Sequence, residues 1–199
     1  MNNKIAWLIL ILIIVAAGSI TAFNLYRHPS ANQQTIETSA IMVKLSPQEI
    51  TKQSDGVIVG TVKNLEIVKA PSNFRPGEED IVTNAVITVE KYLYNPKSLS
   101  SSEITVQTIG GTIDNQTMTS EDSPNFEQGQ RVVVFLRQEP NGTFIIYGGS
   151  QGKYTVNNGN VADNDKERDI FVSVFGKQMT LDEFENEITS IVSAPTPTD

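Results

Sequence analysis

The sequence contains no cysteine, which excludes disulfide bonds, thiolate metal ligands and cysteine nucleophiles. Small exported domains often depend on disulfides, so a folded domain in this chain has to be held by its hydrophobic core alone. Histidine is nearly absent too, since His28 is the only one. A Ser-His hydrolase is therefore disfavoured, because His28 falls in a polar stretch outside the expected fold. A serine that uses a lysine as its base stays open.

Basic residues are too few for a nucleic-acid-binding surface. Lys and Arg number 15 against 23 Asp and Glu, which gives a formal net charge of -8 at pH 7. Nucleic-acid binding needs Lys and Arg side chains that replace the counterions around phosphates. The sequence therefore predicts no nucleic-acid partner.

Long apolar runs are limited to Ile5–Phe23, which carries no charge. As a helix it would span roughly 28 Å, close to the hydrocarbon thickness of a bilayer. A cleavable signal also fits, because Lys4 precedes the run and Ala17 and Ser19 supply small residues. The apolar character continues through Phe23, which favours a retained anchor. We therefore predict a transmembrane signal-anchor at residues 1–23 of a single-pass membrane protein. The bulk of the chain would be extracytoplasmic, or secreted if the segment is cleaved.

Composition divides the remaining chain into a linker, a domain and a tail. Residues 24–40 are polar and aperiodic, which is typical of a linker. Residues 41–192 carry the periodic apolar patterns of a folded domain, here an extracytoplasmic β-barrel domain. Residues 193–199 are polar with two prolines, so we expect a disordered tail.

Two helices are indicated by their capping sequences. Ser46 followed by Glu49 forms a capping box and predicts a short N-terminal helix. Thr180 and Glu183 repeat the box ahead of Leu181–Val192, whose apolar residues fall on one stripe. The sequence therefore predicts a C-terminal amphipathic helix.

Runs of β-branched residues predict that the fold is mainly β. The expected strands are Val57–Val68, Ile81–Tyr94, Glu103–Ile109, Arg131–Arg137, Thr143–Gly148 and Lys153–Val156. Gly60 indicates a bulge or a sharp bend that would curl the first strand. These features favour a small antiparallel OB-like barrel of about five to six strands.

Two further predictions concern the surroundings of this barrel. Arg131–Arg137 is apolar on both faces, so the C-terminal helix should cover its outer face. Thr112–Gln128 is rich in Ser, Thr, Asn and Asp and predicts a long surface loop, either mobile or functional.

Several motifs fail in detail. The acidic run Asp163–Asp169 lacks the glycine and the closing glutamate of a calcium loop, with Val174 in the closing position. Gly148–Lys153 resembles a phosphate loop in composition only, because Tyr154 follows the lysine. The sequence therefore predicts no metal and no cofactor. Asn115 and Asn141 match the N-glycosylation acceptor and lie in expected loops.

A candidate ligand rim is formed by the loops of the expected barrel. In an OB-like barrel these are Ala70–Asp80 and Gln138–Gly142. The first presents Phe74 and Arg75 between prolines, and the second presents Asn141. The alternative for Phe74 is a plug buried over the barrel end.

Three segments carry a resemblance to known proteins, namely Asp55–Val62, Ile87–Leu93 and Phe126–Val132. Their strand pattern resembles that of small exported modules of the netrin type and of tissue metalloproteinase inhibitors, and of uncharacterised exported bacterial and archaeal proteins with an OB-like barrel. Those inhibitors chelate the protease zinc through an N-terminal cysteine, and this chain has no cysteine. The resemblance therefore implies a fold and does not carry the inhibitory chemistry over.

These observations favour a membrane-tethered extracytoplasmic binding or interaction module with a protein or glycan partner, because every catalytic constellation considered is incomplete. The alternative is a cell-surface hydrolase or protease regulator.

Overall fold

The computed structural model describes residues 34–38, 43–72, 75–163, 174–175 and 179–194. The chain divides into two units, residues 1–34 and 35–199, and nearly all of the described residues belong to the second. This unit is mainly β, as the sequence predicted. Within the described ranges no helix is long and apolar enough to cross a membrane. The predicted anchor at residues 1–23 lies outside them, as does most of the predicted tail.

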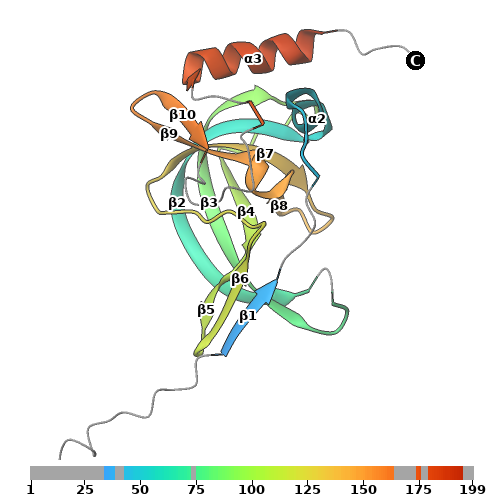
Figure 1. Cartoon of the computed structure of the whole chain (residues 1–199), viewed down its shortest axis with the longest axis vertical. Helices are drawn as coiled ribbons and strands as arrows, with labels where there is room; N and C mark the ends of the chain where they lie inside the picture. The colour runs from blue at the N-terminus through green and yellow to red at the C-terminus, as the bar shows by residue number, and fades with distance from the viewer. Residues whose placement is uncertain (1–33, 39–42, 73–74, 164–173, 176–178, 195–199) are drawn as a thin grey trace, which may run out of the picture. The chain divides into compact units, whose positions relative to one another are not determined.

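Strands dominate the element order, with a short helix near each end (Figure 1). In chain order the elements are β1 (Gln34–Thr38), α2 (Pro47–Gln53), β2 (Gly56–Pro71), β3 (Glu79–Tyr94), β4 (Glu103–Ile109), β5 (Gly111–Ile113), β6 (Gln116–Ser120), β7 (Arg131–Gln138), β8 (Phe144–Ile146), the 3-10 helix η1 (Gly149–Gly152), β9 (Lys153–Asn157), β10 (Asn160–Asp163), β11 (Met179–Thr180) and α3 (Leu181–Ser193).

The strand pairings of the larger sheet run in a cycle. β2 pairs antiparallel with β3 on one side and with β7 on the other, and β3 pairs antiparallel with β4. β8 pairs parallel with β4 and antiparallel with β7, so the order β7-β2-β3-β4-β8 returns to β7. The ladders made by β8 are short, with two residue pairs to β4 and three to β7. Beyond β7 the sheet continues through β9, β10 and β11.

Gly60 allows the bend of β2. The register with β3 shifts between Val59 and Gly60, which confirms the predicted bulge. A Cβ on Gly60 would lie 2.6 Å from both Ile87 Cγ2 and the Thr88 carbonyl oxygen. Only glycine permits the two backbones to approach this closely.

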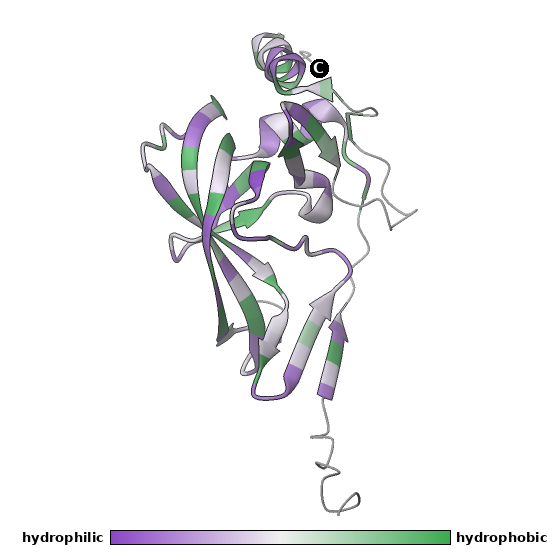
Figure 2. Cartoon of the chain, turned by 90° about the vertical axis from the view of Figure 1, so that its left-hand side faces the viewer, coloured by the Kyte–Doolittle hydropathy of each residue, from purple (hydrophilic) through white to green (hydrophobic). Residues whose placement is uncertain are grey.

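Both faces of β7 are buried, as its sequence predicted. Val132, Val134 and Leu136 pack into the interior of the strand cycle. Val133 and Phe135 pack on the opposite side, in a second cluster that includes residues of α2 and α3. Hydrophobic and hydrophilic residues alternate along several strands (Figure 2). The prediction that the C-terminal helix covers the outer face is confirmed.

The capping boxes of both helices are also confirmed. The Ser46 hydroxyl accepts a hydrogen bond from Glu49 N at 3.2 Å, and Glu49 Oε2 accepts from Ser46 N at 2.8 Å. Thr180 and Glu183 make the same reciprocal pair at the start of α3. In addition, the Gln151 side chain accepts from Leu45 N and donates to Val43 O, both at 3.0 Å. The backbone ahead of α2 is thereby fixed to η1.

Two sequence-based predictions were wrong about polar segments. The stretch Thr112–Gln128, predicted as a loop, contains the β5-β6 hairpin. Its turn residues Asp114 and Asn115 have φ of 48° and 63°, the left-handed conformations that a two-residue hairpin turn requires and that Asp and Asn tolerate. The predicted linker, residues 24–40, contains β1, which pairs with β6. Threonine-rich strands with little apolar alternation hid both elements.

Asp55 connects the start of β2 to two other segments. Its Oδ2 accepts a hydrogen bond from Gln138 N at 2.8 Å, and its Oδ1 lies 3.0 Å from Lys97 Nζ. Burial acts to raise the pKa of Asp55, but the hydrogen bond from Gln138 and the charges of Lys97 and Arg137 together hold it below its ordinary value of 3.8.

We expect the Asp55 carboxylate to make the protein more sensitive to acid. Because its folded pKa is lowered, its contribution to stability is fully present above the unfolded pKa and is lost as the pH falls below about 4. Asp55→Asn should therefore lower the free energy of unfolding by about 1 kcal/mol at pH 7 and flatten its fall between about pH 4 and pH 2. Urea melts across this range measure both effects, with Glu127→Gln at an exposed position as the control. An unchanged acid dependence in Asp55→Asn would contradict the assignment.

Candidate functional site

The predicted rim residues are already engaged in local contacts. Arg75 Nη1 lies 2.7 Å from Glu78 Oε2 and Arg75 Nη2 lies 2.5 Å from Asp80 Oδ1. The hydrogen bond to Asp80 raises the pKa of Arg75. Asn141 Oδ1 accepts from Thr143 N at 3.0 Å and so supports the β7-β8 turn. Phe74 lies outside the described residues.

The two loops of the predicted rim are not brought together. Gly56, at the start of β2, pairs with Leu136 close to the turn that carries Asn141. Pro71, at the other end of β2, pairs with Glu79 beside the loop that carries Arg75. A strand of 16 residues separates the two ends, so the prediction of one shared rim was wrong.

Both glycosylation acceptors lie in exposed turns. Asn115 is in the β5-β6 turn and Asn141 in the β7-β8 turn. Their use stays a prediction.

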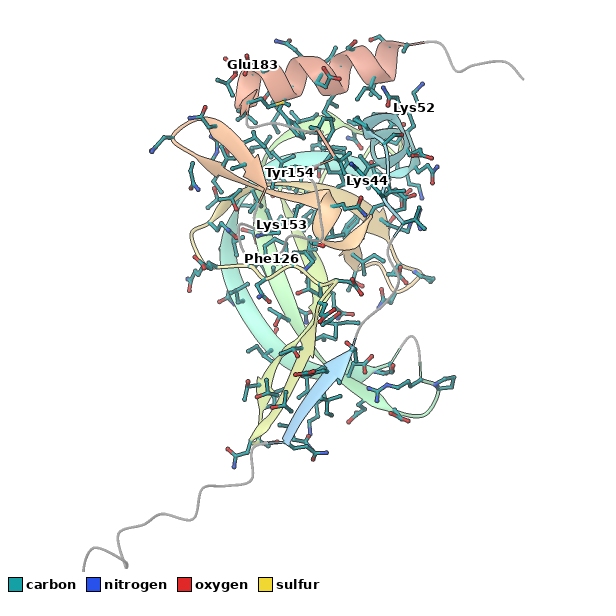
Figure 3. All side chains as sticks on the ribbon, in the orientation of Figure 1. Lys44, Lys52, Phe126, Lys153, Tyr154 and Glu183 are labelled. Carbon is teal, nitrogen blue, oxygen red and sulfur yellow. The ribbon has the colours of Figure 1, made fainter. Side chains whose placement is uncertain are left out.

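A second candidate is the buried amine of Lys153. Lys153 is 1% exposed, and its Nζ lies 4.9 Å from the centroid of the Phe126 ring (Figure 3). Lysines are rarely this buried, so the position attracts interest as a base. The nearby Ser150 Oγ is buried and has no hydrogen-bond partner among the described residues, so it does not form a Ser-Lys pair with Lys153. The amine over the Phe126 ring is a cation–π contact, an ordinary structural role for a lysine.

The most extensive candidate is the outer face of β2, β3 and β4, opposite the buried interior, whose side chains are exposed or half-buried. Its side chains form three cross-strand rows in the observed register. The rows are Thr61-Thr88-Glu103, Asn64-Val86-Thr105 and Glu66-Asn84-Gln107, and these nine residues are called the polar face below. The residues that alternate with them, such as Ala85, Ile87, Ile104 and Val106, are buried in the interior.

The polar face consists mainly of uncharged hydrogen-bonding groups. Gln107 Nε2 donates to Asn84 Oδ1 at 3.0 Å, which aligns two amides across β3 and β4. Each amide keeps further donor and acceptor capacity. The central row carries only Asn64, Val86 and Thr105, with no charge.

Two carboxylates at the border of the polar face, Glu90 and Glu103, form ion pairs, whereas Glu66 is exposed. Arg131 Nη2 lies 2.7 Å from Glu90 Oε2, and this hydrogen bond, with one from Thr61, lowers the pKa of Glu90. Lys63 Nζ lies 2.7 Å from Glu103 Oε1. Exposed pairs of this kind contribute little to stability, and the central row between them carries no charged side chain.

The polar face has the properties of a preformed recognition surface for an uncharged partner. Its side chains project from paired strands, which hold them more precisely than loops do. Rows of amides and hydroxyls can donate and accept at once, as sugar hydroxyls require. The sequence signal was the alternation in Asn84–Thr88 and Glu103–Gln107, but neighbouring rows emerge only once the register is known.

Within the described residues no three His, Asp or Glu side chains gather in a group that could hold a metal ion. The acidic run Asp163–Asp169 lies outside the described side chains. No family model matches the chain, and no curated protein matches its sequence.

Proposed function

We propose that this chain is an extracytoplasmic binding module, tethered to a membrane by residues 1–23, that binds a neutral glycan on the polar face. The observation that carries the proposal is the three-by-three grid of strand-borne side chains centred on Asn64, Val86 and Thr105. Glycan hydroxyls would exchange hydrogen bonds with Asn84 and Gln107.

An OB-like barrel is part of this proposal. The cyclic order β7-β2-β3-β4-β8 supports it, as does the parallel pairing of β4 with β8. OB-like barrels bind oligosaccharides on a comparable strand face. The resemblance to netrin-type modules agrees with the same arrangement.

Replacing both amides with alanine is expected to weaken glycan binding about tenfold. Two hydrogen bonds to neutral groups contribute about 0.5 to 1.5 kcal/mol each, and 1.4 kcal/mol corresponds to tenfold in Kd. The variant is the double substitution Asn84→Ala with Gln107→Ala. The full chain is titrated with cellohexaose, maltohexaose and chitohexaose, and binding is monitored by the backbone amide shifts of β3 and β4.

Asn141→Ala is the matched control, because it removes an exposed amide from a turn at one end of β2. An equal loss of glycan affinity in Asn141→Ala, or no backbone amide shift in β3 and β4 with any of the three glycans, would overturn the proposal.

The hydrolase alternative is separated by assaying the same protein on peptide, ester and glycan substrates. Turnover that is abolished by one Ser, Asp or Glu substitution would establish it.

A further inference from the structure

The second half of β2 has one unpaired edge. β7 pairs with β2 only from Gly56 to Thr61. Val62 then exchanges hydrogen bonds with Gly129 and Gln130, and beyond it no strand within the described ranges pairs with β2 on the side away from β3. The residues from Asn64 to Pro71 therefore form a free strand edge.

A hydrogen bond in the β2-β3 connection shows which backbone groups of β2 point away from β3 along this edge. Ser72 N donates to Glu78 O at 2.9 Å, so these two residues form a hydrogen-bonded pair. Such pairs alternate along an antiparallel ladder, which directs the backbone groups of Glu66 and Val68 toward β3. The N–H and C=O groups of Leu65, Ile67 and Lys69 consequently point away from β3, into the free edge.

Side chains on the free edge continue both faces of the sheet, the interior face and the polar face. Leu65 packs against the interior cluster, and Ile67 on the same side stays 43% exposed. Ile67 Cγ2 would lie 2.5 Å from a Cβ on Gly111, so one side of Ile67 is covered by β5 while its outer side is open. Glu66 belongs to the polar face on the opposite side. An added strand would cover Ile67 and extend both faces.

We propose that the edge of β2 from Leu65 to Lys69 binds an extended peptide segment as an additional antiparallel strand. Backbone hydrogen bonds would supply the affinity, and the alternating side chains would supply the specificity. Charge complementarity specifies the partner: an acidic residue opposite Lys69, an apolar residue opposite Ile67 and a basic residue opposite Glu66. This inference does not depend on glycan binding by the polar face.

A second copy of this chain fits the edge less well than such a peptide. Outward-pointing residues must pair with outward-pointing residues, so Glu66 of one copy never lies directly opposite Lys69 of the other. A symmetric pair centred on Ile67 would place Lys69 opposite Leu65. The bulge beside Lys63 and the proline at position 71 also limit the edge to a short match, which is how natural edges avoid unspecific association.

The probe is the synthetic peptide Thr-Glu-Thr-Val-Lys-Val-Thr, titrated against the full chain and followed by backbone amide shifts and fluorescence polarisation. Saturable shifts at Leu65, Ile67 and Lys69 are expected. A charge-swapped peptide, with Glu and Lys exchanged, should bind at least about tenfold more weakly. A peptide that is N-methylated at the edge-facing amides should not bind, because it lacks the donors.

Two proline variants test which residues of β2 direct their backbone N–H groups outward and which direct them toward β3; this assignment is called the phase of the edge. Ile67→Pro removes an outward N–H and should reduce peptide binding at least about tenfold, with a Tm change of only a few degrees. Val68→Pro removes an N–H bonded to β3 and should lower Tm by about 10 °C or more. Equal Tm changes for the two variants would overturn the assigned phase.

Absence of shifts at Leu65 to Lys69 with millimolar peptide, or equal binding of the charge-swapped peptide, would overturn the proposal itself. The double variant Asn84→Ala with Gln107→Ala should bind the peptide normally. Peptide binding and glycan binding therefore succeed or fail independently of each other.

Discussion

Phe184→Ala is expected to lower the free energy of unfolding by about 3 to 5 kcal/mol, as is typical for a buried phenylalanine. Phe184 is 1% exposed and packs, together with Ile188 of the same helix, in the cluster on the outer face of β7. Its ring centroid lies 4.7 Å from Phe175, 5.4 Å from Tyr154 and 6.3 Å from Phe135. Truncation removes the burial energy of one ring and leaves a cavity bordered by three others.

Urea melts of the full chain measure the loss. Val192→Ala on the same helix is the matched control, because Val192 is 41% exposed and should change stability by less than about 0.5 kcal/mol. A loss of less than about 1.5 kcal/mol in Phe184→Ala would mean that α3 contributes little to the hydrophobic cluster on the outer face of β7.

Gly152→Ala should destabilise the protein by about 3 kcal/mol or more, through overpacking. A Cβ at this position would overlap the carbonyl oxygen of Tyr147 and lie 2.7 Å from Ile146 Cγ2. The first of these is backbone, so relief requires β8 or η1 to shift. Since β8 joins the cycle through only a few residue pairs, its ladders to β4 and β7 should weaken together.

Gly129→Ala separates this clash from backbone strain. Gly129 has a φ of 80°, and nothing lies within 4 Å of an added Cβ. Alanine there should cost only about 1 kcal/mol, from the left-handed conformation alone. Comparable losses in the two variants, measured by thermal and urea unfolding, would contradict the assignment to overpacking.

The sequence was most informative where a local pattern determines the structure by itself. Ser46 and Glu49 define a helix start through contacts three residues apart. The double-sided apolar run in Arg131–Gln138 required two covered faces whatever the topology, and both are buried. Gly60 indicated a bulge because few other roles explain glycine within a strand.

Sequence reasoning was least informative where the outcome depends on distance along the folded chain. The loops with Arg75 and Asn141 were assigned to one rim, but β2 extends far enough to hold them at its opposite ends. Lysine is usually exposed, so the burial of Lys153 could not be predicted from its own segment. The Phe126 ring that lies against it is 27 residues away in sequence. The polar face could not be found without the register, because one residue of slip would turn it to the interior.

The pairing of β2 with β7 has a consequence for the order of folding. Gly56 and Leu136 are partners although 80 positions separate them, whereas β2 and β3 are neighbours joined by a short connection. The β2-β3 ribbon can therefore form early, and closure through β7 must wait for a large loop to be ordered. Until then the edge of the first half of β2 is unpaired and open to other chains, as the edge of the second half remains in the native state. The first half is hydrophobic, so it is the segment that nascent or refolding chains most need to shield.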